Sequence, residues 1–274
     1  MAQLGNIRKM RTGHKFPVQY ELPLGEHILS MNSLIGSNIT IRYSGKIHCV
    51  ECGRRTNKSF SQGYCYPCFR SLAACDRCIM SPELCHYDQG TCRQPEWADE
   101  HCMQPHIVYL ANSSGIKVGI TRGDQVPVRW MDQGAMQALP IFRVGNRYQS
   151  GLLEVVIKKY VTDRTDWRKM LKNCVEPVDL KAWWSNLKES NPEILLELEQ
   201  ASTQAEVIPL DNESVYEFSY PVEVNPEKIK TFNLDKTPEV SGLLQGIKGQ
   251  YLMLDGGVIN IRKYGGYEVS IESA

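Results

Sequence analysis

Apolar and polar residues alternate along two stretches near the start of the chain. Residues 18–24 and 38–43 carry an apolar side chain at nearly every second position. This is the pattern of a β-strand with one buried face. Glycines separate these stretches from their neighbours. The pattern therefore predicts that residues 16–48 form extended segments rather than helices.

The middle of the chain predicts a hairpin, a short helix, a strand and a longer helix. Residues 106–112 and 116–121 are apolar segments joined by Ser-Ser-Gly, which is typical of a β-hairpin. Pro127 suits the first position of a short helix. Residues 139–144 predict a third strand, and residues 150–160 place their apolar side chains on one face of a helix.

The last third of the chain changes from helical to extended patterns. Residues 164–203 favour helices, and Asn-Pro-Glu at positions 191–193 is typical of a helix start. Residues 205–271 return to short strands with glycine turns, including an Asp-Gly hairpin signal. Many short strands favour a small β-barrel or sandwich, which we expect the strands from both ends of the chain to build together.

Composition fits a globular protein. Of the 274 residues, 42% are hydrophobic and 23% are charged, which is unlike a disordered chain. No apolar run approaches the length of a membrane span, and the N-terminus lacks the apolar core of a secretory signal. We therefore expect a cytoplasmic protein without a membrane partner.

Charge is balanced overall but unevenly distributed. The formal net charge is zero, yet residues 1–70 contain ten basic and three acidic residues, and residues 189–239 contain twelve acidic residues and three lysines. The basic part would attract a phosphate backbone. The same distribution also fits two halves that face each other, or two solvated surfaces.

Nine of the ten cysteines lie between positions 49 and 102. The first four form two Cys-x-x-Cys pairs twelve residues apart, at Cys49, Cys52, Cys65 and Cys68. Two residues between thiols allow one tight turn to direct both sulfurs at one ion, so two such pairs predict a tetrahedral structural zinc site. Disulfides and unpaired core thiols are the alternatives, and a cytoplasmic chain favours metal over disulfides.

The remaining cysteines of this stretch offer more ligands than one ion needs. We expect a second zinc ion on the preferred quartet Cys75, Cys78, Cys92 and Cys102. The alternative ligands are Cys85, His86 and His101. An iron–sulfur cluster is the competing interpretation, because it also binds four thiolates. Cys174 stands apart from the others, and we expect it to be a small, buried side chain.

Residues 105–162 resemble the GIY-YIG nuclease superfamily. Ile107-Val108-Tyr109 and Lys117-Val118-Gly119 stand where that family has its two tripeptides. Helices bearing Arg129 and Glu154 follow in the family's order, at a spacing that is short for the family. The sequence also departs from the family at Lys117, where a tyrosine is usual, and at Ile107, where a glycine is usual.

This resemblance implies phosphodiester hydrolysis. In that interpretation Glu154 holds a Mg²⁺ or Mn²⁺ ion that polarises the phosphoryl group. Tyr109 orients or deprotonates the attacking water, and Arg129 stabilises charge on the phosphate oxygens. Lys117 and Arg122 assist as phosphate contacts. The structural alternatives are a solvated helix residue for Glu154, a packed strand aromatic for Tyr109 and a surface cation–π contact for Arg129.

The whole chain also resembles a group of cysteine-rich bacterial proteins of unassigned function. The resemblance rests on the sequence Cys-Gly-Arg-Arg at positions 52–55 and on four further segments, Gln62–Cys68, Gly90–Trp97, Lys117–Arg122 and Gly246–Tyr251. It implies no known activity.

These observations together predict an α+β protein of five segments. They are N-terminal β segments at 1–48 that pair with the C-terminal part, a cysteine-rich zinc module at 49–104, a GIY-YIG-like mixed α/β domain at 105–163, a helical segment at 164–204 and a C-terminal β domain at 205–274.

The predicted function is that of a zinc-containing, nucleic-acid-binding protein, with divalent-metal-dependent phosphodiester hydrolysis implied by the resemblance. DNA and RNA fit equally well. Basic and aromatic side chains interleave around Cys65, as they do on surfaces that stack single strands. The residues expected to contact nucleic acid are Arg54, Arg55, Lys58 and Arg122. Two alternatives are a non-catalytic nucleic-acid or protein interaction module and a metal or redox sensor.

Overall fold

Strands from both ends of the chain form one sheet in the computed structural model, which describes residues 2–202 and 206–273. The long strand β5 (Asn38–His48) lies between β12 (Glu239–Lys248) and β15 (Tyr267–Ser273), and both pairings are antiparallel. Ile39 and Ile41 of β5 are fully buried. The alternation of apolar and polar residues in this stretch therefore corresponds to a buried face of β5.

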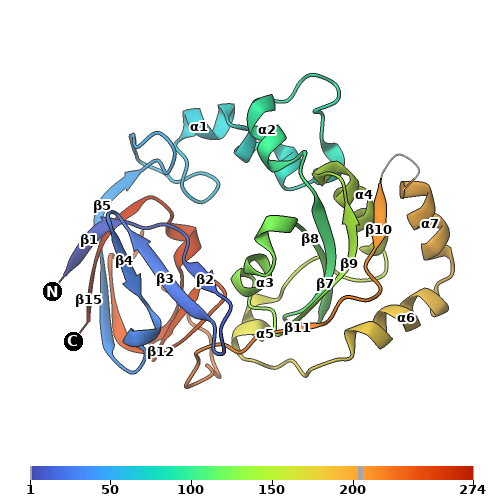
Figure 1. Ribbon diagram of the computed structural model, residues 1–274. Helices are drawn as coiled ribbons and strands as arrows, with labels where there is room; N and C mark the ends of the chain where they lie inside the picture. Colours follow the sequence, from blue (N-terminus) through green and yellow to red (C-terminus); the bar gives the residue numbers. More distant parts are fainter. Residues whose placement is uncertain (1, 203–205, 274) are drawn as a thin grey trace.

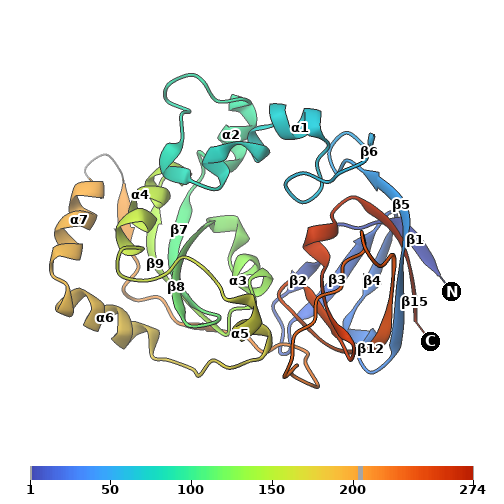
Figure 2. The same cartoon turned by 180° about the vertical axis from the view of Figure 1, so that it is seen from behind.

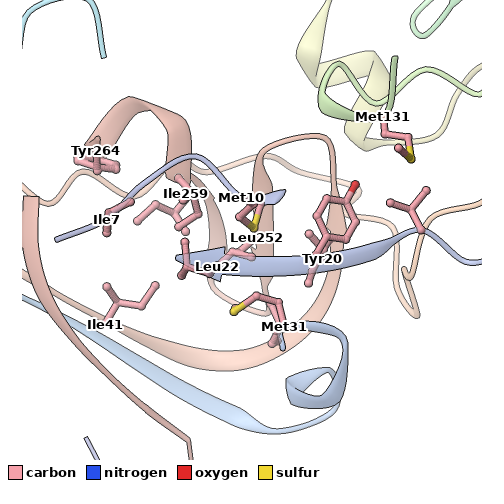
Figure 3. Packing of buried hydrophobic residues seen from close by; sticks show 14 of the residues in the cluster. Ile7, Met10, Tyr20, Leu22, Met31, Ile41, Met131, Leu252, Ile259 and Tyr264 are labelled. Carbon is pink, nitrogen blue, oxygen red and sulfur yellow. The ribbon is translucent and has the colours of Figure 1, made fainter. Parts of the chain in front are cut away.

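This sheet has seven strands, and a smaller sheet packs on it. Its other strands are β1 (Gln3–Asn6), β6 (Arg55–Thr56), β13 (Tyr251–Leu254) and β14 (Gly257–Asn260). The small sheet contains β2 (Arg11–Gly13), β3 (Gln19–Leu24) and β4 (His27–Ser30). Figure 3 shows Tyr20 and Leu22 of the small sheet in one core with Ile41, Leu252 and Ile259 of the large sheet.

Of the two expected forms, a small β-barrel or a sandwich, the closed barrel does not form. In the part of the chain that the structure describes, β1 and β14 are the two edges of the large sheet and no hydrogen-bonded ladder joins them. The two sheets instead close over shared side chains, with Met10 and Met31 filling the space between them (Figure 3). Apolar side chains from both sheets therefore close this lobe, because the strand ladder does not.

The middle of the chain forms a second lobe around a five-stranded sheet. Its long strands are β7 (His106–Asn112), β8 (Ile116–Arg122) and β9 (Gln137–Val144), and its short strands are β10 (Val207–Pro209) and β11 (Tyr216–Glu217), in the order β10-β9-β7-β8 with β11 paired to β9. The predicted hairpin and third strand are confirmed. Two helices accompany the sheet, α3 (Val128–Asp132) and α4 (Arg147–Ile157).

Helix α4 begins at Arg147, before the predicted start at residue 150. The Asn146 side chain accepts a hydrogen bond from the Gln149 backbone N–H and so caps the helix. The apolar pattern alone could not place this start, because the capping residue precedes the first buried position.

The two faces of the second sheet pack against different hydrophobic cores. Val108 and Leu110 of β7 face the core that contains α4, whereas Tyr109 and Ala111 face the core shared with the first lobe. Three more helices, α5 (Trp167–Leu171), α6 (Leu180–Ser190) and α7 (Glu193–Ser202), follow α4. Figures 1 and 2 show α6 and α7 on the outer side of this lobe. The predicted boundary between 204 and 205 lies outside the described residues.

The cysteine-rich segment connects the two lobes. It contains α1 (Tyr66–Ser71), α2 (Pro95–His101) and three short 3₁₀ helices, η2 (Ala73–Cys75), η3 (Arg77–Ile79) and η4 (Pro82–Leu84). Both views place it above the space between the lobes (Figures 1 and 2). The remaining 3₁₀ helices are η1 (Asn32–Leu34), η5 (Gly123–Gln125) and η6 (Ile261–Tyr264). Among the described helices, none has the length and apolar character needed to cross a bilayer.

A buried carboxylate at the end of α3 joins the lobes directly. Asp132 is 4% exposed and forms an ion pair with Lys9 of the first lobe. Its Oδ1 also accepts a hydrogen bond of 2.9 Å from Gln250 Nε2. The Gln250 amide in turn pairs with the backbone N–H and carbonyl of Met10. These polar contacts hold the two lobes together beside the apolar core that they share.

Candidate functional site

The first four cysteines converge as their spacing predicts. Their sulfur atoms all lie within 4.8 Å of one another, and Cys52 Sγ is 3.7 Å from Cys65 Sγ. Tetrahedral zinc with bonds of about 2.3 Å separates its ligand sulfurs by roughly 3.8 Å. The cluster of Cys49, Cys52, Cys65 and Cys68 therefore fits a metal ion such as zinc.

Two local structures direct these thiols. After β5, the Cys49 N–H donates to the Arg54 carbonyl at 2.8 Å, and the Gly53 N–H donates to the Cys49 carbonyl at 3.0 Å. The resulting tight turn carries the first pair of thiols. Cys65 caps the N-terminus of α1, and Cys68 lies in its first turn. A turn and a helix start thus face each other across one ion site.

The electrostatics of the Cys49 and Cys68 thiols fit a metal-ligand set. Burial opposes ionisation of Cys49, but backbone N–H groups of Cys52, Cys65 and Glu51 lower its pKa to about 6. Burial and the three neighbouring thiols raise the pKa of Cys68. The Cys49 thiolate thus forms easily whereas Cys68 resists ionisation, and a divalent cation would offset the repulsion between such thiolates. The described cysteines form no disulfide.

The later cysteines divide into two groups. Cys78, Cys85, Cys92 and Cys102 all line one small cavity that also contacts Asp76 and His86. Cys75 is not among the described residues that line this cavity. His101 stacks on Trp97 and its Nδ1 lies 2.9 Å from the Trp97 carbonyl oxygen. Cys174 is exposed, so the expectation of a buried thiol there was wrong. It follows α5 in a polar loop, away from either core.

A polar cluster lies where β7, β8 and α3 meet. Tyr109 of β7 and Lys117 of β8 lie on the same face of the hairpin. Gln133, which follows α3, accepts two hydrogen bonds at its Oε1, one of 2.7 Å from Lys117 Nζ and one of 3.1 Å from the Tyr109 hydroxyl. The sequence did not predict a role for Gln133, because a single amide side chain after a short helix belongs to no recognisable motif.

Gly119 of the second tripeptide packs directly against Tyr109 of the first. Tyr109 and Gly119 are opposite each other in the β7–β8 ladder. A Cβ atom on Gly119 would lie 2.7 Å from the Tyr109 hydroxyl oxygen and 2.8 Å from the ring carbon that bears it. The phenol therefore lies directly over the glycine, and only hydrogen leaves room for it.

Arg129 and Glu154 complete the cluster. Burial raises the pKa of Tyr109, and the nearby Arg129 guanidinium opposes this shift. Burial lowers the pKa of Lys117 to about 8, with a further lowering by Arg129 and an opposing effect of Glu154. Tyr109, Lys117 and Arg129 thus lie together, and the charge of Glu154 is near enough to act on Tyr109 and Lys117. Arg147 of α4, which the sequence did not single out, is near enough for its pKa to respond to the charges of Arg129 and Glu154.

A cationic cleft opens beside this cluster. It has a volume of about 610 Å³ and is lined by residues of both lobes and of the cysteine-rich segment. Its basic side chains are Arg8, Lys9, Arg11, Arg129 and Arg262. No aspartate or glutamate occurs among the described residues that line it. Burial and the neighbouring Arg129 lower the pKa of Arg262, so two guanidinium groups from different lobes repel each other across this cleft.

The predicted nucleic-acid contacts lie elsewhere. Arg54 and Arg55 are exposed on the first cysteine turn and on β6. Lys58 lines a different groove, together with Lys263 and Asn260. Arg122 forms an ion pair of 2.9 Å with Asp124. None of the four is among the described residues that line the cationic cleft. The run Arg-Lys-x-Arg at positions 8–11 was visible in the charge distribution, whereas Arg262 had no local signal.

Comparison with known proteins places the chain in a family. The model of the family described as "Protein of unknown function (DUF2797)" matches residues 36–269, so the chain belongs to that family. This agrees with the predicted resemblance to proteins of unassigned function. No curated protein and no solved structure matches the chain.

Adding a methyl group to Gly119 should displace the Tyr109 ring. We expect Gly119→Ala to lower the free energy of unfolding by about 1–3 kcal/mol, because the ring must leave a filled position. Urea unfolding measures this. Gly13→Ala is the control: it is also a strand glycine, but a Cβ there would meet its nearest neighbour, Gln19 Cβ, at 3.6 Å. Equal effects of the two substitutions would contradict the close packing of Tyr109 on Gly119.

The binding of zinc to the first cluster should require Cys52 as strongly as it requires the buried thiols, although Cys52 is exposed. We expect Cys52→Ser to lose one zinc ion per chain and to lower the melting temperature, because three remaining thiolates hold the ion poorly. Mass spectrometry of metal content and calorimetry measure both. Cys174→Ser, another exposed thiol, should change neither. Unchanged zinc content in Cys52→Ser would exclude this ligand set.

Proposed function

We propose that this protein binds nucleic acid in the cationic cleft and hydrolyses phosphodiester bonds at the cluster of Tyr109, Lys117, Arg129 and Glu154. One observation carries the proposal. Arg129 lines the cleft and also interacts with Tyr109 and Lys117. A phosphate held in the cleft by Arg129 would therefore lie next to the residues that could act on it.

The cleft favours a polyanion on electrostatic grounds. Its four arginines are concentrated on one surface of a chain whose net charge is zero, while Lys9 is paired with Asp132. Arg129 and Arg262 repel each other at close range, which costs free energy in the unbound protein. A phosphate between them would turn this repulsion into two attractions and would give bidentate hydrogen bonds.

The order of elements supports the same conclusion. The strands β7 and β8, helix α3, strand β9 and helix α4 follow one another as they do in the GIY-YIG superfamily that this segment resembles. The two tripeptides form one hairpin, with Tyr109 opposite Gly119. Lys117 occupies the position where that family has its second tyrosine, and its ammonium group shares Gln133 with Tyr109.

The side chains suggest how a water molecule would be activated. Hydrolysis joins the water oxygen to phosphorus while the bond from phosphorus to the ester oxygen breaks. In our proposal a neutral Lys117 amine takes the water proton, and the leaving oxygen takes a proton from solvent. A lysine with a pKa of about 8 is partly neutral near physiological pH. Tyr109 is a poorer base, because burial raises its pKa, and it would orient the water instead.

Glu154 suits the divalent cation that the resemblance implies. Burial raises the pKa of Glu154, Lys158 and Arg147 oppose this shift, and the carboxylates of Asp163 and Glu83 add to it. A cation would offset the repulsion among these three carboxylates. Glu154 alone would leave Mg²⁺ or Mn²⁺ ligands to be filled by water and phosphate, as Mg²⁺ prefers. The ion would polarise the phosphoryl group.

Cleavage should require both Glu154 and Lys117. We expect Glu154→Gln and Lys117→Met each to lower the rate at least about 100-fold, since each removes a group that acts in the transition state. The assay uses end-labelled DNA and RNA, single-stranded and duplex, with Mg²⁺ or Mn²⁺. The wild-type rate should rise as pH increases through about 8, because Lys117 becomes neutral there.

The control for cleavage is Glu199→Gln, which changes an exposed carboxylate on α7 far along the chain from the cluster. It should retain the wild-type rate. The same background cleavage in the wild type and in both site variants would exclude catalysis. A rate that depends on Glu154 but does not change near pH 8 would exclude Lys117 as the base.

Binding should depend on the cleft rather than on the first cysteine turn. We expect Arg11→Gln and Arg262→Gln each to weaken oligonucleotide binding and to reduce the slope of log affinity against log salt by about 1, as loss of one phosphate contact does. Fluorescence anisotropy in the Glu154→Gln background measures binding without cleavage. Arg54→Gln and the exposed Lys181→Gln are controls that should leave the slope unchanged.

The binding and cleavage assays together separate the proposal from its non-catalytic alternative. Salt-dependent binding through Arg11 and Arg262 without any cleavage would indicate that the nuclease-like lobe is a scaffold. Binding that depends on Arg54 and Arg55 but not on the cleft would move the interface to the first cysteine turn. An affinity that changes neither with salt concentration nor with substitution of these arginines would exclude nucleic acid as the partner.

A further inference from the structure

The four cysteines after Cys75 surround a space of atomic size. Cys78 lies in η3, Cys85 follows η4, Cys92 lies in the next loop and Cys102 follows α2. All four line one cavity of about 10 Å³, which is roughly the room of one small occupant. The walls of one cavity therefore bring these four thiols together.

The segment that carries these thiols has little else to hold it. Between residues 73 and 102 the only buried apolar residues are Ala73, Pro82, Ala98 and Cys102, all of which the structure describes. Its helices are short and it contributes no strand to a sheet. A stretch without its own apolar core needs a cross-link to keep one structure, and metal or disulfide bonds serve this purpose in small modules. No disulfide is formed here.

The oxygen and nitrogen atoms beside the cavity already have partners. Asp76 accepts hydrogen bonds from Arg93 Nε at 2.8 Å and from the Arg77 backbone N–H at 2.6 Å. His86 Nδ1 lies 2.8 Å from the Thr91 hydroxyl, and its Nε2 lies 3.4 Å from Asp76 Oδ2. One ligand atom each of Asp76, His86 and Cys78 does lie within 4.8 Å of the others. Their hydrogen bonds suit a surrounding shell that orients a thiolate site.

Cys75 faces the other metal site. Its thiol interacts with Ser61 and with Cys49 of the first cluster. The first cluster already has four thiolates, and Cys75 is absent from the described lining of the second cavity. Cys75 was predicted as a ligand of the second site because it forms a Cys-x-x-Cys pair with Cys78. In the structure the 3₁₀ helices η2 and η3 direct these two side chains differently.

We propose that Cys78, Cys85, Cys92 and Cys102 form a second structural zinc site. Cys85 is a ligand of this site instead of Cys75, which the Cys-x-x-Cys spacing had predicted. Four thiolates are a ligand set that zinc prefers, and they would fill all four tetrahedral positions of the ion. None of the ligands of this site belongs to the catalytic cluster, so its zinc content can be tested whether or not the protein is a nuclease.

The proposed site also fixes the helix that carries Glu154. Ile79, next to Cys78, accepts a hydrogen bond of 2.7 Å from Arg147 Nη2, and the Cys102 carbonyl accepts one of 2.8 Å from the Arg147 N–H. The ligand loop also packs tightly on α4, since a Cβ on Gly151 would lie 2.6 Å from Pro82 Cβ. Cross-linking residues 78–102 therefore holds the start of α4 in place.

The test is the zinc content of purified full-length variants. We expect two zinc ions per chain in the wild type, one in Cys85→Ser and two in Cys75→Ser. Cobalt substitution should give the absorption of tetrahedral thiolate coordination, weakened by about half in Cys85→Ser. Loss of an ion in Cys75→Ser, in Asp76→Asn or in His86→Gln would overturn this ligand set, as would two ions in Cys85→Ser.

A labelling experiment on the wild type covers the case in which Cys85→Ser does not fold. Thiols are alkylated under native conditions, with and without a zinc chelator, and each cysteine is followed by peptide mass spectrometry. We expect the labelling of Cys78, Cys85, Cys92 and Cys102 to rise sharply once the chelator is added. Labelling of exposed Cys174 should not change. Equal labelling of Cys85 in both conditions would overturn the proposal.

Discussion

The arrangement of the whole molecule depends on one buried charge. Asp132 lies at the end of α3 and receives Lys9 and Gln250 from the first lobe. Removing Lys9 would leave the buried Asp132 carboxylate with the Gln250 amide but without its opposite charge, which destabilises the folded protein. Arg129 precedes Asp132 by three residues on the same short helix. The contact that joins the lobes therefore also sets how far Arg129 stands from Arg262 across the cleft.

The cysteine-rich segment adds a second connection between the lobes. At one end its first cluster continues from β5 of the first lobe. At the other end its loops receive Arg147 and pack against Gly151 of α4 in the second lobe. Residues Ser61, Tyr64 and Met80 of the segment line the cleft between these ends. Metal binding in this segment would thus stiffen one wall of the cleft, although the metal itself takes no part in the proposed chemistry.

Sequence patterns located the features that depend on near neighbours. Alternation located β3 and β5, the turn Ser-Ser-Gly located the β7–β8 hairpin, and Cys-x-x-Cys spacing located the first metal cluster. Features that depend on distant partners were missed. The short strands β6 and β11 exist only because β5 and β9 offer them hydrogen bonds. Gln133 and Arg262 gain their importance from groups on other elements, and no local pattern marks them.

The pairing of β5 has a consequence for how the chain acquires its structure during translation. The side chains of Thr40 and Ser241 share a hydrogen bond although 201 residues separate them. As β5 leaves the ribosome, neither of its neighbours β12 and β15 has been made, so both of its edges are open to strands of other nascent chains. The β7–β8 hairpin needs only local contacts and can form much earlier. Although β1 and β5 are synthesised early, they are therefore among the last strands to find their partners, whereas the local sheet of β2, β3 and β4 does not have to wait.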